Sequence, residues 1–317
     1  MIRFVAIRLV EIAVVLALLS FAIYVLIGLM PGDPIDLMRN ADPHMTAADV
    51  AHLKAVYGLD RPLVARYLAW ITGALAGNLG YSRLFAEPVW TVLLPRLGNS
   101  LVLMGSSFIL ALLLGLVLGT LAARRPHSRL DAAINLVCFA GVSVPTFWLA
   151  LVLILVFAAD LGWLPASGAA TAGVAEIGDR LRHLVLPVAT LTLASVGGYT
   201  RYVRAAMREA LAEDHIRTAR AKGAGPARVI VHHALRSAMV PVTTILALSF
   251  GSLVSGALVT ETMFAYPGMG KLIFDAVMGN DYNLALAGLL LAAVVTMLAN
   301  LAADLAYGWL DPRVTYR

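Results

Sequence analysis

Long apolar runs that alternate with polar segments dominate the hydrophobic pattern of the chain. Six of these runs reach roughly 20 residues, the length that an α-helix needs to cross the hydrocarbon of a bilayer. The predicted spans are Leu9 to Met30, Ser100 to Ala123, Ala132 to Ala159, Leu184 to Tyr202, Ala238 to Thr260 and Leu284 to Leu305. The pattern therefore predicts an all-α integral membrane protein with six transmembrane helices.

The composition supports this interpretation. Apolar residues make up 60% of the 317-residue chain and charged residues only 14%, and the mean hydropathy is +0.83. In soluble domains about a quarter of the residues are charged. The single cysteine, Cys138, excludes an intrachain disulfide and a metal site built from several cysteines.

The basic residues predict how the chain is oriented in the membrane. Fifteen of the 24 Lys and Arg residues lie in the short segments 1–8, 124–131, 201–236 and 311–317, and the others are spread over longer alternate segments. Basic residues close to the ends of spans stay in the cytoplasm, so both termini are predicted to be cytoplasmic. The net charge of +5 thus reflects topology, and nucleic-acid binding is not expected.

These predictions divide the chain into three parts. Residues 1–30 form an N-terminal tail and the first span, and residues 31–98 form an extracytoplasmic loop region with short helices. Residues 99–317 form a five-helix core with a cytoplasmic loop at 203–237.

Two short helices are predicted in the extracytoplasmic region. Thr46 followed by Asp49 resembles a capping box, which indicates a helix from Ala47 to Tyr57. A second helix has Pro62 at its first turn, and apolar side chains follow on one face: Leu63, Tyr67, Leu68 and Ile71. Trp70 and Trp90 are interpreted as anchors at the membrane interface.

The cytoplasmic loop is basic and partly amphipathic. Charged side chains lie at helical spacings along its first half: Glu209, Glu213, Asp214 and Arg217. Ile216 and Ala219 give this helix an apolar edge, Gly223 ends it, and Pro226 opens a second helix. Arginines alone would hold the loop in the cytoplasm. The apolar edge and the break between two helices favour, in addition, docking onto another protein.

The loop resembles the "EAA" loop of permease subunits from binding-protein-dependent ABC importers. Its stretch IRTARAKGAGPARVIVHHALRSAMVP is similar to the dipeptide, oligopeptide and nickel branch of that family. Gly223 occupies the position of the glycine of the motif, whereas Arg217 replaces its glutamate and Arg236 its proline. Further phrases, among them LGWLPASG, ETMFAYPGMGKLIFDAV and LDPRV, extend the resemblance over essentially the whole chain.

The resemblance implies a type I ABC importer permease fold in the bacterial plasma membrane. It also implies a second, similar permease subunit as a heterodimer partner, two cytoplasmic ATPases that bind ATP and Mg, and an extracytoplasmic solute-binding protein. This chain itself is expected to bind no cofactor. The expected coupling element, which contacts an ATPase, comprises Glu213, Asp214, His215, Ile216, Arg217, Thr218, Ala219, Arg220, Ala221, Lys222 and Gly223.

Small and hydroxyl-bearing residues in two predicted spans are candidates for the translocation path. They are Ser249, Ser252 and Ser255 in the fifth span, and Ser143 and Thr146 beside Pro145 in the third. The same residues also suit close helix packing, and the sequence leaves both interpretations open. For Gly115 and Gly119 of the second span, packing against another helix is expected.

The sequence offers no catalytic or metal site. Gly268 to Lys271 resembles the end of a phosphate-binding loop, but Leu272 stands where that loop needs Ser or Thr. The centres of the spans lack charged residues, which argues against an ion-driven carrier. We therefore expect a non-enzymatic transport subunit for dipeptides or oligopeptides. The alternatives are nickel or metal-chelate uptake, a secondary carrier and a non-transporting membrane scaffold.

Overall fold

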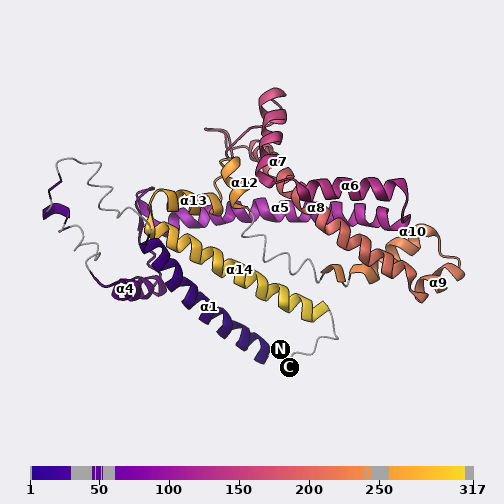
Figure 1. Cartoon of the computed structure of the whole chain (residues 1–317), viewed down its shortest axis with the longest axis horizontal. Coiled ribbons are helices and arrows are strands. Elements are labelled where there is room, and N and C mark those ends of the chain that lie inside the picture. The colour runs from indigo at the N-terminus through magenta and orange to yellow at the C-terminus, as the bar shows by residue number, and fades with distance from the viewer. Residues whose placement is uncertain are drawn as a thin grey trace. The chain divides into compact units, whose positions relative to one another are not determined.

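The computed structural model describes residues 2–29, 45–46, 48–50, 52, 61–239, 241–243 and 257–310. These residues are mainly helical (Figure 1). The chain forms two compact units. The first unit comprises Met1–Asn99 and Gly268–Met297, and the second comprises Ser100–Pro267 and Leu298–Arg317.

The first unit contains the N-terminal helix and a small β-hairpin. Its elements are α1 (Ile2–Gly28), α4 (Leu63–Leu75), β1 (Tyr81–Ser82), β2 (Glu87–Pro88), the start of α5 (Val89–Arg124), α13 (Met269–Met278) and the start of α14 (Tyr282–Leu310). The helix predicted after Pro62 is confirmed as α4. It lies against α1, where the Tyr67 hydroxyl is 2.7 Å from that of Ser20 and the Tyr67 ring packs edge-on against Phe21.

One carboxylate joins the hairpin to the start of α14. Asp281 is 2% exposed and accepts hydrogen bonds from the Ser82 hydroxyl at 2.6 Å and the Leu84 amide at 3.0 Å. It also accepts one from the Leu284 amide at 3.3 Å, in the first turn of α14. Apolar side chains from four helices form the core of this unit, among them Ile23, Ile27, Val89, Leu93, Leu272 and Leu284.

The second unit contains the rest of the described helices. They are α6 (Arg129–Ser143), α7 (Thr146–Leu153), the π-helix η1 (Ile154–Asp160), α8 (Ile177–Ala212), α9 (Asp214–Ala221), α10 (Pro226–Arg228), the π-helix η2 (Val229–Ala234) and α12 (Leu258–Met263). The packing expected of Gly115 and Gly119 is confirmed, because a Cβ at Gly119 would lie 2.7 Å from the Val203 Cβ on α8. The lack of a side chain at these two positions of α5 lets α8 approach closely.

Four of the described helices are long and apolar enough to cross a membrane: α1, α5, α8 and α14. They correspond to the first, second, fourth and sixth predicted spans. Both α5 and α8 are longer than predicted, at 36 residues each, because α5 begins at Val89 and α8 runs from Ile177 to Ala212. Most of the fifth predicted span, including Ser249, Ser252 and Ser255, lies outside the described residues.

The third predicted span differs from the expectation of one continuous helix from Ala132 to Ala159. The chain bends by 102° between α6 and the α7–η1 segment. Pro145 has no N–H to donate, and its ring disfavours helical backbone at the preceding residue. Val144 is accordingly extended, with φ −83° and ψ 126°. The proline therefore breaks this segment instead of being tolerated within it.

The predicted capping box near residue 46 is confirmed. The Thr46 amide donates to the Asp49 carboxylate at 2.9 Å, and the Asp49 amide donates to the Thr46 hydroxyl at 3.2 Å. The Thr46 hydroxyl also donates to that carboxylate, at 2.6 Å. The hydrogen bonds from the Thr46 side chain and backbone lower the pKa of Asp49. Most of the helix predicted from Ala47 to Tyr57 lies outside the described residues.

Candidate coupling site

The loop between the fourth and fifth predicted spans begins where α8 ends. The segment 203–212 contains neither Gly nor Pro, so α8 continues as far as Ala212. Glu213 is extended, with φ −69° and ψ 152°, and separates α8 from α9. The short helix predicted to include both Glu209 and Arg217 is therefore wrong in its boundary, because the chain turns between these residues.

Gly223 ends α9 as predicted. Its φ of +81° lies in the left-handed region, where only glycine is free of steric cost. The Gly223 amide donates to the Arg220 carbonyl at 3.0 Å, and the Ala224 amide donates to the Ala219 carbonyl at 3.1 Å. This pair of hydrogen bonds is the Schellman arrangement that satisfies the last carbonyls of a helix. Pro226 then opens α10 at its first position, also as predicted.

One face of α9 is fixed to the chain's own helices. Ile216 is 0% exposed and Ala219 is 8% exposed. Both belong to a core cluster with Met207 and Ala210 of α8 and with Val229 of η2. The apolar edge that suggested docking onto another protein is thus used inside the chain, because α8 and η2 already cover it. The apolar edge is therefore not available to a partner protein, and the argument for docking that was based on it was wrong. The burial of this edge does not show which other surface a partner would contact.

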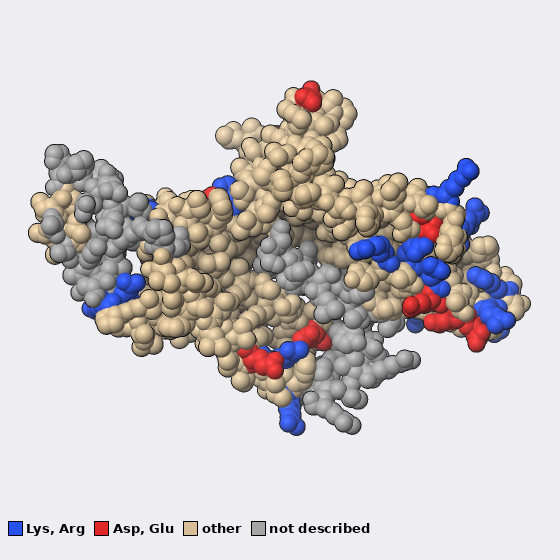
Figure 2. Space-filling model, in the orientation of Figure 1, with Lys and Arg blue, Asp and Glu red and all other residues tan. Residues whose placement is uncertain are grey.

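The opposite face of α9 is exposed. It carries Asp214, Arg217, Thr218 and Ala221, which follow helical spacing. The Asp214 and Arg217 side chains are 94% and 79% exposed, and their charged groups lie 3.4 Å apart. Exposed ion pairs contribute little to stability, so both side chains are free to exchange this contact for another. Figure 2 shows Lys, Arg, Asp and Glu side chains gathered over α9 and α10.

The remaining residues of the expected coupling element flank these two faces. The His215 Nδ1 lies 2.8 Å from the Glu213 carboxylate, and its Nε2 lies 3.4 Å from the Ser237 hydroxyl beyond η2. Arg220 and Lys222 are exposed. The eleven residues therefore form one continuous turn and helix, in which Ile216 and Ala219 point inward and the other nine are exposed.

A buried ion pair near this loop escaped the sequence analysis. Arg204 of α8 donates from Nε and from Nη2 to the two carboxylate oxygens of Asp131, each at 2.7 Å. The Asp131 side chain is 4% exposed and also accepts from the His127 amide and the Asn135 side chain. The sequence contained one indication of this pair, an aspartate in the otherwise basic turn ARRPHSRLD. No residue near Asp131 in the sequence indicated that Arg204 would be its partner.

Two of the five candidate path residues are described. Ser143 is exposed, and its hydroxyl donates to the Phe139 carbonyl of its own helix at 2.8 Å. Thr146 is half-buried and begins α7 on the other side of the break at Pro145. Their assignment to a path remains a prediction.

Comparison with protein families matches residues 115–316 to the binding-protein-dependent transport system inner membrane component. Residues 1–104 match the N-terminal region of such membrane components. The chain belongs to this family. It is therefore a multi-pass transport subunit of the bacterial inner membrane, and it is the membrane component of an ABC importer and not its ATPase.

Curated relatives cover nearly the whole chain. The oligopeptide transport system permease protein AppB of Bacillus subtilis is 40% identical, over 92% of this chain and 93% of its own length. The di/tripeptide permease DppB of Pseudomonas aeruginosa is 39% identical, over 95% and 94%. The dipeptide permease DppB of Escherichia coli is 36% identical over the same shares of the two chains.

Solved structures share the fold. A chain of the inward-facing MetNI methionine ABC transporter aligns with a TM-score of 0.58 at 18% identity, covering 70% of this chain and 97% of its own. A chain of an amino acid ABC transporter aligns with a TM-score of 0.52 at 14% identity, covering 67% and 91%. These likenesses confirm the type I importer permease fold. The exact number of spans and the cytoplasmic location of both termini stay predictions.

Family membership also decides between the broad functional alternatives. A binding-protein-dependent system comprises a solute-binding protein and an ATPase beside its membrane component, so partners of both kinds are expected from the family itself. A self-contained secondary carrier and a non-transporting scaffold do not fit this assignment.

Proposed function

We propose that the chain is one of two permease subunits of an ATP-driven importer of dipeptides and oligopeptides. The relatives at 36% to 40% identity carry names that specify oligopeptide, di/tripeptide or dipeptide transport. The second permease would be a similar but distinct chain, so that the path lies between the two. ATP and Mg would bind to two cytoplasmic ATPase subunits, and no cofactor would bind to this chain.

The exposed face of α9 would contact one of those ATPases. The observation that carries this proposal is the division of α9 into two faces. Ile216 is fully buried against α8 and η2, whereas Asp214 and Arg217 extend almost completely into solvent. A helix held on one side by packed side chains transmits a push as a rigid body, because close-packed interiors are hardly compressible.

Closure of the ATPases would therefore move α9 and α8 together. Two sets of contacts support such a motion. The apolar cluster around Met207 joins α9 to α8, and the Asp131–Arg204 pair joins α8 to α6. Displacement of these helices would then open the path between the two permeases alternately to either side of the membrane.

ATP-dependent uptake of a labelled dipeptide by the complete importer in proteoliposomes tests this function. Arg217→Glu reverses a charge on the exposed face of α9 without touching the core. Arg125→Glu makes the same change in the basic segment 124–131, where Arg125 is also exposed, and serves as the matched control.

We expect Arg217→Glu to lower uptake at least about tenfold, which corresponds to the loss of one charged contact. ATP hydrolysis should then respond less to the solute-binding protein, whereas Arg125→Glu should transport normally. Normal uptake by a well-incorporated Arg217→Glu variant would remove this face from the coupling contact. Uptake of a nickel chelate in place of dipeptide would overturn the proposed solute.

A further inference from the structure

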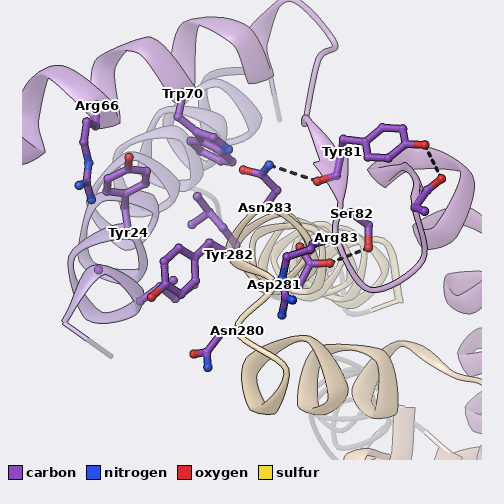
Figure 3. Close-up of a pocket in the computed structure, with 14 residues that line it drawn as sticks. Tyr24, Arg66, Trp70, Tyr81, Ser82, Arg83, Asn280, Asp281, Tyr282 and Asn283 are labelled. Atoms are coloured by element: carbon purple, nitrogen blue, oxygen red, sulfur yellow. Dashed lines mark hydrogen bonds between the residues drawn. The ribbon is translucent and has the colours of Figure 1, made fainter. Parts of the chain in front are cut away.

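A cavity of about 480 Å³ lies within the first unit. Figure 3 shows it between the end of α1, the helix α4, the β1–β2 hairpin and the residues that precede and begin α14. Both α1 and α14 are candidate membrane spans. Because the cavity adjoins Gly28, where one span ends, and Tyr282, where the other begins, it lies at the level of a membrane interface.

The walls of the cavity combine aromatic and aliphatic side chains. Tyr24 of α1, Trp70 of α4 and Tyr282 of α14 surround it (Figure 3), and Ile27 and Leu286 add aliphatic surface. Tyrosine and tryptophan are enriched where a membrane meets water, because one end of each side chain is apolar and the other is polar. Trp70 was interpreted as a simple interfacial anchor, whereas the structure makes it part of a cavity.

The charges around the cavity favour an anion. Arg66 and Arg83 line it together with the single carboxylate of Asp281. That carboxylate already accepts three hydrogen bonds from Ser82, Leu84 and Leu284, as described above. Arg83 donates to the Gly279 carbonyl, which leaves further guanidinium N–H groups for a ligand. The two arginines and the one carboxylate, whose oxygens already accept hydrogen bonds within the chain, give the lining of the cavity a net positive charge.

Two buried polar atoms at the cavity lack a partner among the described residues. They are the Nε1 of Trp70 and the Oδ1 of Asn280. Buried polar groups in folded proteins are nearly always hydrogen-bonded, so unpaired ones beside a cavity indicate a polar occupant. Trp70 offers a donor and Asn280 an acceptor, which suits a ligand that carries both oxygen atoms and hydroxyl groups.

We propose that this cavity binds the headgroup of an anionic phospholipid. The phosphate would lie between Arg66 and Arg83, and the glycerol portion would meet Trp70 and Asn280. Acyl chains need a neighbouring apolar surface, and the end of α1 supplies one: Leu26 and Leu29, the residue that follows the helix, are 65% and 72% exposed. Binding of a transported peptide does not require an exposed apolar surface beside the cavity, whereas binding of a lipid does. The observations therefore favour a lipid as the occupant.

The site is tested on the purified, assembled importer in detergent by native mass spectrometry, with dioleoylphosphatidylglycerol as the probe. Arg66→Gln removes a cation, and Trp70→Phe keeps an aromatic ring, although a smaller one, and removes the N–H donor. Arg61→Gln is the matched control, because Arg61 is exposed just before α4 and does not line the cavity. Dioleoylphosphatidylcholine, glycerol phosphate and a labelled dipeptide are added in parallel.

The wild-type importer should retain phosphatidylglycerol in preference to phosphatidylcholine. Arg66→Gln and Trp70→Phe should each weaken retention about tenfold, as expected for the loss of one strong hydrogen bond, and Arg61→Gln should not. Equal retention by all variants would overturn the proposal. It would also fail if glycerol phosphate displaced the lipid stoichiometrically, or if these substitutions weakened dipeptide binding instead. None of these outcomes depends on α9, so failure here would leave the proposed coupling contact standing.

Discussion

The carboxylate of Asp131 and the guanidinium of Arg204 meet in a two-point contact across 73 residues of sequence. This contact joins the first turn of α6 to α8, and Figure 1 shows these helices running side by side. Two parallel N–H···O bonds fix the relative orientation of the two groups as well as their distance. The pair therefore sets the position from which α8 leads into α9.

Removal of one partner should be costly, because the other charge would then remain buried without compensation. We expect Asp131→Asn to lower the stability of the second unit by about 3 kcal/mol. Arg204→Lys should also destabilise it, since lysine cannot reproduce the two-point geometry. Thermal unfolding in detergent measures both effects. Arg208→Lys, at an exposed position on the same helix, is the control and should unfold like the wild type.

Ile216 distinguishes a packing role from a docking role. Because its side chain is fully buried, Ile216→Ala should loosen α9 from α8 by about 2 to 4 kcal/mol. Hydrogen exchange of the α9 amides would then become faster, even in the isolated permease. Arg217→Ala, on the exposed face, should leave exchange unchanged. Unaltered exchange in the Ile216 variant would show that α9 does not depend on this packing.

Glycine is needed at position 223 because of the backbone conformation there, and not because a side chain would clash with neighbouring atoms. A Cβ there would meet nothing within 4 Å, but its φ of +81° would strain any other residue. Gly223→Ala should cost about 1 kcal/mol and should expose the Ala224 amide to exchange. Gly225→Ala is the matched control, with φ −64° and an equally open surrounding. Equal effects of the two substitutions would argue against the helix end described here.

The contact between α6 and α8 depends on a glycine at position 197. A Cβ there would overlap the Cys138 carbonyl oxygen and would lie 2.9 Å from the Val142 Cγ2. Gly197→Ala should therefore destabilise the second unit by about 1 to 3 kcal/mol. The adjacent Gly198 has nothing within 4 Å of the position that a Cβ would occupy, so Gly198→Ala should be neutral or slightly stabilising. Thermal unfolding of the two variants should therefore show a lowered midpoint for Gly197→Ala alone.

Local signals in the sequence predicted much of the fold. Proline fixes its own φ and glycine tolerates a positive φ, so Pro62 predicted the start of α4 and Gly223 the end of α9. Of the six spans predicted from the apolar runs, four correspond to described helices that are long and apolar enough to cross a membrane. Their ends were less accurate, because polar residues continue a helix as readily as apolar ones, and α8 accordingly extends to Ala212.

The features that were missed depend on tertiary contacts. A proline within a predicted span removes one helical hydrogen bond, but only the packed structure decides between a mild kink and the 102° bend at Pro145. The apolar edge at Ile216 was visible in the sequence, whereas the helices that cover it were not. The Asp131–Arg204 pair and the cavity beside Trp70 combine residues from distant segments, and no spacing rule connects these.

Site-specific photo-cross-linking from Thr218 in the complete importer tests the central claim most directly. Thr218 lies on the exposed face of α9, and a photoreactive residue at exposed Arg125 provides the comparison. We predict that position 218 cross-links to an ATPase subunit, that bound ATP changes the yield, and that position 125 gives much less product. A transport-competent importer in which position 218 never reaches an ATPase would contradict the account.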